Sequence, residues 1–152
     1  MSTSDELWME AALREALRAQ DNDEVPVGAV VVHQGKIIGR GYNRNRSDSD
    51  PTAHAEIVAL REAGRTLGNY RLEGCEIFVT IEPCAMCCGA LVHARLARLV
   101  YGADDAKAGA VHSAMRVLNH AQLNHFMEVQ GGVLAGKCTQ MMQAFFQQRR
   151  GQ

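Results

Sequence analysis

The spacing of apolar residues predicts a helix at the start of the chain and a β-hairpin after it. Thr3 and Glu6 form a capping-box pattern, and the apolar residues behind them recur at helical spacing until about Gln20. The β-branched run 27–32 and the extended pattern 37–42 enclose a Gln-Gly pair that favours a turn. These two segments are therefore expected to pair as antiparallel strands.

Helices and strands are expected to alternate through the rest of the chain. After a polar loop, Thr52 is positioned to cap a helix that continues through Leu67. The apolar run 75–81 is typical of a buried strand, and Pro83 ends it. The later elements are expected to be a helix over 84–93, a strand over 99–101, a short helix over 112–118, a strand over 126–129 and a long helix over 134–150.

This order of elements predicts an α/β protein. With 152 residues, the chain is expected to form one domain, residues 1–152, around a single core. Helices that alternate with strands favour a sheet covered on both faces, so we predict a three-layer α/β/α fold with a mixed five-stranded sheet. The hairpin strands should be antiparallel, and at least some of the later strands should be parallel.

The composition is typical of a water-soluble globular protein. The chain is 47% hydrophobic and 22% charged, and no apolar run approaches the roughly 18 residues of a membrane span. The first ten residues are polar and acidic, unlike a secretory signal. We therefore expect a cytoplasmic protein with no membrane partner.

Charge is distributed unevenly along the chain, although the net charge is only −1. Residues 1–24 contain seven acidic and two basic residues, a net charge of −5, which leaves +4 on the remainder. Most of the positive residues in that remainder are arginines. The near-zero total is therefore compatible with a local basic groove for a nucleic acid, and equally with a solvated surface of mixed charge.

The strongest chemical signal is a histidine and a pair of cysteines at two expected helix starts. The motifs are Thr-Ala-His-Ala-Glu at 52–56 and Pro-Cys-Ala-Met-Cys at 83–87. Cys84 and Cys87 are spaced i, i+3, which places both sulfurs on one face of a first helical turn, where the helix dipole favours thiolates. With His54 they would supply three protein ligands to a zinc ion and leave the fourth tetrahedral position to water.

Glu56 is the candidate proton carrier of such a site. Zinc lowers the pKa of water from about 15.7 toward 7, and a neighbouring carboxylate can take the proton and return it to a ring nitrogen and a departing amine. His-x-Glu together with Pro-Cys-x-x-Cys is the signature of the zinc deaminases. However, His54 and Glu56 are spaced i, i+2 and do not face each other on a regular helix. We therefore expect an irregular first turn, or a water molecule between the two side chains.

Two other interpretations use the same motifs. A structural zinc module would need a fourth protein ligand, for which Cys88 and Cys75 are the candidates. A deaminase of a free base or nucleotide, such as guanine or cytosine, would keep the zinc and the glutamate but would not depend on RNA. On a helix, Cys88 points about 100° away from Cys87. We therefore interpret Cys88 as a small buried thiol, and Cys75 and Cys138 as core residues.

Longer segments of the chain resemble the bacterial tRNA-specific adenosine deaminases of the cytidine deaminase-like superfamily. The resemblance extends over nearly the whole chain. It rests on EVPVGAVVV (24–32), GYNR (41–44), DPTAHAEIVAL (50–60), NYRL (69–72), EPCAMCCGALVHAR (82–95), LVYGADDAKAGA (99–110) and FFQQRR (145–150). The zinc signature specifies only the superfamily, whereas the PVGAV, DPT and YGADDAK segments make the narrower match.

This resemblance implies a cytidine deaminase-like fold, a single deaminase domain and one Zn²⁺ per subunit. It also implies hydrolysis of adenosine to inosine at the wobble position of a tRNA anticodon loop. The anticodon stem-loop would then be the main partner. A second copy of the chain would be another, because the resemblance implies a homodimer that builds each site with help from the neighbouring subunit.

The resemblance further implies four substrate contacts. Asn43 matches a position that contacts the flipped nucleotide, and Asp105 matches one near the anticodon-loop backbone. Phe146 and Arg149 match positions on the last helix that pack against the RNA loop. An aromatic ring and a guanidinium suit base stacking and phosphate contact, although Phe145 or Phe146 could instead belong to the core.

Overall fold

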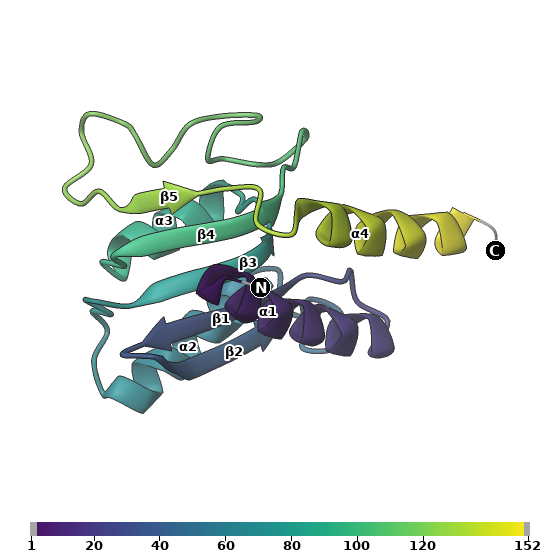
Figure 1. The fold of residues 1–152 in the computed structure, drawn as a ribbon, viewed down its shortest axis with the longest axis horizontal. Coiled ribbons are helices and arrows are strands. Elements are labelled where there is room, and N and C mark those ends of the chain that lie inside the picture. The colour runs from purple at the N-terminus through teal and green to yellow at the C-terminus, as the bar shows by residue number, and fades with distance from the viewer. Residues whose placement is uncertain (1–2, 151–152) are drawn as a thin grey trace.

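The computed structural model describes residues 3–150, which form four helices and five strands (Figure 1). The helices are α1 (Ser4–Asp21), α2 (Ala55–Leu67), α3 (Ala85–His93) and α4 (Ala135–Arg150). The strands are β1 (Gly28–His33), β2 (Lys36–Tyr42), β3 (Glu76–Ile81), β4 (Arg98–Ala103) and β5 (Glu128–Gln130). The predicted capping box of α1 is present, since Thr3 and Glu6 each accept a hydrogen bond from the other's backbone.

The five strands form one mixed sheet in the order β2-β1-β3-β4-β5. β1 is antiparallel to both β2 and β3, whereas β3, β4 and β5 are parallel to one another. The helix α3 connects the parallel pair β3 and β4. The predicted mixture of an antiparallel hairpin and later parallel strands is therefore confirmed.

Helices cover both faces of this sheet, because successive side chains of each strand enter two different cores. Ala29 and Val31 of β1 pack in the core beneath α2 and α3. Val30 and Val32 of the same strand pack with α1 and with Cys138 of α4. Figure 1 shows α1 in front of the sheet, α2 and α3 behind it, and α4 extending past the ends of the strands, while Cys138 near the start of α4 packs in the same core as α1. The predicted three-layer α/β/α fold is confirmed.

A close approach between β2 and α2 fixes the start of α2 against the sheet. A Cβ atom on Gly41 would overlap the carbonyl oxygen of Ala55, and one on Gly39 would overlap that of Ala59. Only glycine allows two backbones to come this close. The first turn of α2, which contains the glutamate of the His-x-Glu motif, therefore packs directly against the end of β2.

The predicted short helix over 112–118 is wrong. The structure has turns and irregular backbone from the end of β4 to β5, and the predicted strand over 126–129 is displaced to Glu128–Gln130. The physical reason is a competing acceptor: the backbone N–H groups of Val111, His112 and Ser113 donate to the carboxylate of Glu82. Val117 and Leu118 nevertheless pack against the core, which explains their apolar pattern.

The predicted cap of α2 is also wrong. Both the backbone N–H and the hydroxyl of Thr52 donate to Asp50, at 2.8 Å each, so Thr52 belongs to the preceding turn. The N-cap residue of α2 is His54. Between residues 3 and 150, no helix combines the length and the apolar character needed to cross a lipid bilayer.

Candidate metal centre and substrate-binding residues

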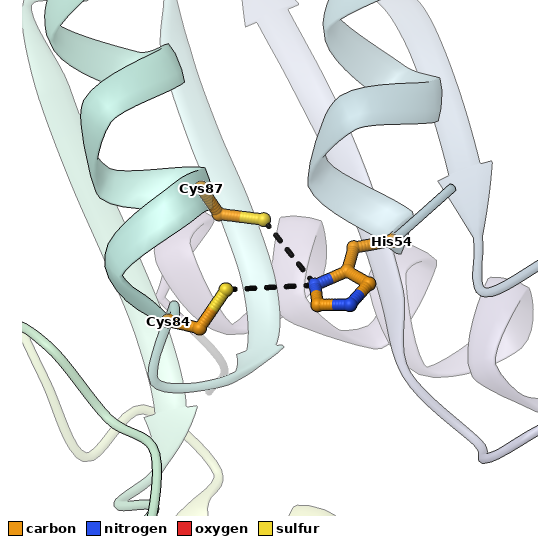
Figure 2. A group of neighbouring side chains, drawn as sticks. All are labelled: His54, Cys84 and Cys87. Carbon is orange, nitrogen blue, oxygen red and sulfur yellow. Dashed lines mark hydrogen bonds between the residues drawn. The ribbon is translucent and has the colours of Figure 1, made fainter. Parts of the chain in front are cut away.

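Three side chains from two separate helix starts converge beyond the end of β3 (Figure 2). The Nδ1 atom of His54 lies 3.6 Å from the Sγ atom of Cys84 and 3.6 Å from that of Cys87. All three possible ligand atoms lie within 4.8 Å of one another. Cys87 is buried, whereas His54 and Cys84 are half-buried. The cluster is therefore partly open to solvent.

These separations fit a tetrahedral zinc ion. Zinc binds imidazole nitrogen at about 2.0–2.1 Å and thiolate sulfur at about 2.3 Å, so nitrogen and sulfur ligands at a tetrahedral angle lie about 3.6 Å apart. The two observed nitrogen–sulfur distances match this value. One nitrogen and two sulfur donors also form a ligand set that zinc prefers. The three residues can therefore hold one zinc ion with one position left for another ligand.

The cap position of His54 explains how a histidine and a glutamate at i, i+2 can serve one site. His54 has extended backbone, with φ −73° and ψ 155°, and lies before the first helical residue. The side chain of Asn43 accepts a hydrogen bond from the backbone N–H of Ala55 at 2.8 Å. Asn43 thus satisfies a backbone N–H at the start of α2 that has no acceptor within the helix, as a capping residue does. The facing rule for two helical positions therefore does not apply to His54 and Glu56, because only Glu56 is helical and the first turn of α2 itself is regular.

Cys84 has the same place on α3 as His54 has on α2. It is the N-cap residue with extended backbone, and Cys87 follows in the first turn. Hydrogen bonds from the Cys87 thiol and from His54 lower the pKa of Cys84 to about 3. The same contact, followed by burial and the nearby Glu56 carboxylate, raises the pKa of Cys87. The two sulfur atoms and the imidazole are therefore close enough to influence one another's ionisation, as ligands of one ion would.

Glu56 lies in the first turn of α2, with only 3% of its surface exposed. Burial raises its pKa, against the opposing influence of the nearby His54. A carboxyl group in this environment binds a proton more readily than an exposed one. That property suits a group that must accept a proton and then release it during a reaction.

The remaining cysteines lie outside the cluster. Cys88 is buried, and its thiol points to the carbonyl oxygen of Pro83 at 3.7 Å. Burial raises its pKa to about 12, which keeps it protonated. Cys75 and Cys138 are also buried in the apolar cores. The interpretation of Cys88, Cys75 and Cys138 as buried thiols is confirmed.

The structure brings two of the four predicted substrate contacts close to the segments that carry the cluster. Asn43 follows β2 and caps α2, and its amide nitrogen has no hydrogen-bond partner within residues 3–150. Asp105 lies in the loop after β4, where one of its carboxylate oxygens accepts the N–H groups of Lys107 and Ala108. The free amide nitrogen and the second carboxylate oxygen remain available to a ligand.

The other two predicted contacts lie on a separate helix, α4. Phe146 is 42% exposed and meets the buried Phe145 edge-to-face at 5.3 Å, so Phe145 is the core residue of the pair. Arg149 lies over the ring of Phe145, 4.6 Å from its centre, and forms an ion pair with Asp23. Asp23 also pairs with Arg46 at 2.9 Å. Asp23 therefore links the end of α4 to the loop that leads to His54.

Glu82 is a functional candidate that the sequence reasoning missed. Its side chain is fully buried and accepts hydrogen bonds from the loop after β4. Burial alone would raise the pKa of Glu82, but the donors from His112, Ser113 and Asp105 lower it to about 2. The sequence did contain a signal, because Glu82 follows the apolar strand directly and precedes Pro83. An acidic residue at such a buried position needs several hydrogen-bond donors from other segments.

Comparison with known proteins agrees with this geometry. The family model of the cytidine and deoxycytidylate deaminase zinc-binding region matches residues 2–103. The tRNA-specific adenosine deaminase of Haemophilus influenzae is 48% identical over 150 residues, which cover 98% of this chain and 87% of the relative. The protein of the same name from Bacillus subtilis strain 168 is 44% identical over 97% of this chain and 92% of the relative.

A solved structure is similar as well. It comes from biochemical and structural studies of A-to-I editing by tRNA:A34 deaminases at the wobble position of transfer RNA. The TM-score is 0.86 at 44% sequence identity, over 89% of this chain and 98% of that one. Since the matched family region binds zinc and this chain has a group that can hold one ion, the predicted cofactor is confirmed. The fold is cytidine deaminase-like, and the chain belongs to the tRNA-specific adenosine deaminase family of zinc-dependent deaminases.

Proposed function

We propose that this protein hydrolyses adenosine to inosine at the wobble position of a tRNA anticodon loop. The observation that carries the proposal is the half-open cluster of His54, Cys84 and Cys87, with the buried Glu56 two residues from His54. Relatives that carry the tRNA-specific name match nearly the whole chain. Because the substrate is a tRNA, we also propose that the protein acts in the cytoplasm, as one catalytic domain.

In this proposal, His54, Cys84 and Cys87 hold the metal and Glu56 moves the protons. Bound zinc supplies Lewis acidity, which lowers the pKa of water. Glu56 accepts a proton from the attacking water, whose oxygen bonds to C6 of adenine. Glu56 delivers this first proton to ring N1. It then carries the second proton of that water from the new C6 hydroxyl to the amino group, the C6–N bond breaks, ammonia leaves and the C6 carbonyl of inosine forms. Burial raises the pKa of this carboxyl, so that the carboxylate is a stronger base toward the attacking water than an exposed one.

We propose that Asn43, Asp105, Phe146 and Arg149 bind the RNA. The free amide nitrogen of Asn43 is near the cluster and can donate to the extruded nucleotide. The exposed ring of Phe146 and the guanidinium of Arg149 offer a stacking surface and a phosphate contact. A loop nucleotide is already partly unstacked, so its extrusion into such a site costs little.

A direct comparison of substrates tests the function. We expect kcat/KM for an anticodon stem-loop to exceed that for free adenosine by at least about 10³-fold, because contacts far from the base position it for reaction. Inosine in the stem-loop is measured by sequencing. Chromatography measures the deaminated products of the free compounds, which are inosine from adenosine, xanthine from guanine and uracil from cytosine. Equal or better turnover of any free base or nucleoside would contradict the RNA assignment and favour a small-molecule deaminase.

The salt dependence of stem-loop binding tests whether arginines of α4 contact RNA phosphates. Replacement of Arg149 and Arg150 with alanine should weaken binding and flatten the plot of log K against log salt by up to about 0.7 per lost phosphate contact. Zinc content should not change. As a matched pair, Arg14 of α1 and Lys36 of β2 are exposed and lie outside the groove beside α2 and α3, and their replacement should leave the salt dependence as it is.

We propose that the protein is a homodimer and that a groove beside α2 and α3 is the contact surface. The groove has a volume of about 1150 Å³, and its lining includes Leu60, Leu72, Ala90 and Tyr70. Tyr70 is 77% exposed and lines this groove beside its apolar residues, and aromatic side chains are enriched at protein–protein interfaces. A second copy of this chain would cover the groove and bury that ring.

The mass in solution tests this dimer. Light scattering should give twice the 16.6 kDa of one chain for the wild-type protein. Tyr70→Asp should shift the mass toward that of one chain, because it places a charge in a buried interface. Phe126→Asp is the control, since Phe126 is 59% exposed outside the groove. A wild-type monomer at micromolar concentration would contradict the proposal.

A further inference from the structure

One buried carboxylate organises the first part of the segment between β4 and β5, residues 104–113. An oxygen of Glu82 accepts the backbone N–H of Asp105 at 3.1 Å. Its other oxygen accepts the N–H groups of Val111, His112 and Ser113, at 3.0, 2.9 and 3.0 Å. The hydroxyl of Ser113 donates to the carboxylate as well. The carboxylate therefore ties both ends of the loop 104–113 to one point.

Because these hydrogen bonds use all the acceptor positions of its carboxylate, Glu82 cannot also bind a metal ion. Its carboxylate lies within 4.8 Å of Asp104 and His112, an arrangement that resembles a second metal site. A carboxylate has about four lone-pair positions, and the five donors already occupy them. His112 instead pairs with Asp104 at 2.8 Å. The Glu82 carboxylate therefore serves to hold the loop 104–113 in place.

The backbone of Gly109 lies against the same carboxylate. A Cβ atom on this glycine would overlap both the carboxyl group of Glu82 and the carbonyl oxygen of Asp105. Gly109 also donates its N–H to that carbonyl at 2.9 Å. A substituent at position 109 would therefore push the loop away from Glu82 without changing Glu82 itself.

The held loop is joined directly to the turn that carries the cysteines. Ala110 donates its N–H to the carbonyl oxygen of Pro83 at 2.8 Å, next to Cys84. Glu82 itself donates its N–H to Ala103 at the end of β4, also at 2.8 Å. The loop 104–113, which includes Asp105, therefore packs beside the cluster of His54, Cys84 and Cys87.

We propose that Glu82 is a positioning residue, which holds the loop 104–113 against the Pro83–Cys84 turn so that Asp105 is in place before the RNA binds. The proposal rests on the proposed function, because it assigns this loop to substrate binding. Loops that are ordered before binding avoid an entropic cost when the ligand arrives. A loosened loop should therefore raise KM for the stem-loop, while the chemistry at Glu56 continues.

Two variants that loosen the loop by different means test the inference. Gly109→Ala adds a Cβ that displaces the loop, and Glu82→Gln places amide hydrogens against the N–H donors. Both should raise KM for the stem-loop about tenfold, with kcat within about twofold and one zinc per chain. Gly136→Ala is the matched control, since a Cβ there meets no atom within 4 Å, and its KM should not change. An unchanged KM in both loop variants overturns the inference.

A double-mutant cycle separates positioning from a general loss of structure. If Gly109 and Glu82 act through Asp105, then adding Gly109→Ala to Asp105→Ala should raise KM little further. Independent, multiplicative effects would overturn the inference. Ser113→Ala removes only the hydroxyl donor and should give a smaller rise in a well-folded protein. The wild-type protein is assayed first: inactivity there contradicts the proposed function, whereas an active wild type with unaffected variants contradicts only this inference.

Discussion

Replacement of Glu56 with glutamine is expected to reduce deamination of the stem-loop by at least about 10⁴-fold. General acid–base groups contribute about 10²–10⁴-fold, and Glu56 serves more than one proton transfer in the proposed mechanism. Glutamine matches the buried side chain in size but can neither accept nor deliver the proton. The rate is measured as single-turnover inosine formation, with the enzyme in excess.

Two measurements show whether this loss is chemical. Zinc content and melting temperature of Glu56→Gln should stay near the wild-type values, because Glu56 is not a proposed ligand. Glu62→Gln is a matched control on the same helix, where Glu62 is exposed. Its turnover should be unchanged. Activity of Glu56→Gln within tenfold of the wild type would disprove the role as a proton carrier.

Replacement of Cys84 with alanine is expected to lower the zinc content from about one per chain to nearly zero and to abolish activity. Among residues 3–150, three potential protein ligands lie within reach of one another at this site, so the loss of one thiolate leaves two. Cys88→Ala should keep both zinc and activity, because Cys88 lies outside the cluster. Elemental analysis of the purified variants gives the stoichiometry.

The pair of cysteine variants also distinguishes the catalytic site from a structural zinc module. A module with four protein ligands would lose zinc in Cys88→Ala or Cys75→Ala. A full equivalent of zinc in Cys84→Ala would contradict the assignment of the ligands. Loss in Cys84→Ala with retention in Cys88→Ala fits three ligands and an open fourth position.

Sequence reasoning predicted the sheet and the cluster because both depend on local patterns. The continuous apolar run of β1 indicates a strand that is buried on both faces of the sheet. Helix starts after extended segments bring His54 and Cys84 to one edge. The awkward spacing of His54 and Glu56 arose only from treating both as helical. The cap position of His54 removes the conflict, and no propensity scale distinguishes a cap from the next residue reliably.

What the sequence could not predict depends on contacts between distant segments. The apolar spacing of Val111, Val117 and Leu118 fits a helix, but Glu82, about 30 residues earlier, takes the N–H groups that a helix would use. Likewise, nothing near Arg149 in the sequence indicates that Asp23 is its partner. Such long-range pairs override local preference, because a buried carboxylate without donors costs more than a short helix gains.

The ion pair between Arg149 and Asp23 makes this arginine an internally compensated charge. An RNA phosphate that takes the guanidinium releases a condensed cation, but it also leaves Asp23 with Arg46 alone, and the carboxylate attracts a cation back. The net ion release from Arg149 is therefore smaller than one full phosphate contact supplies. Arg149 then contributes more to the shape of the binding surface than to long-range attraction, and uncompensated arginines carry most of the electrostatic steering toward the RNA.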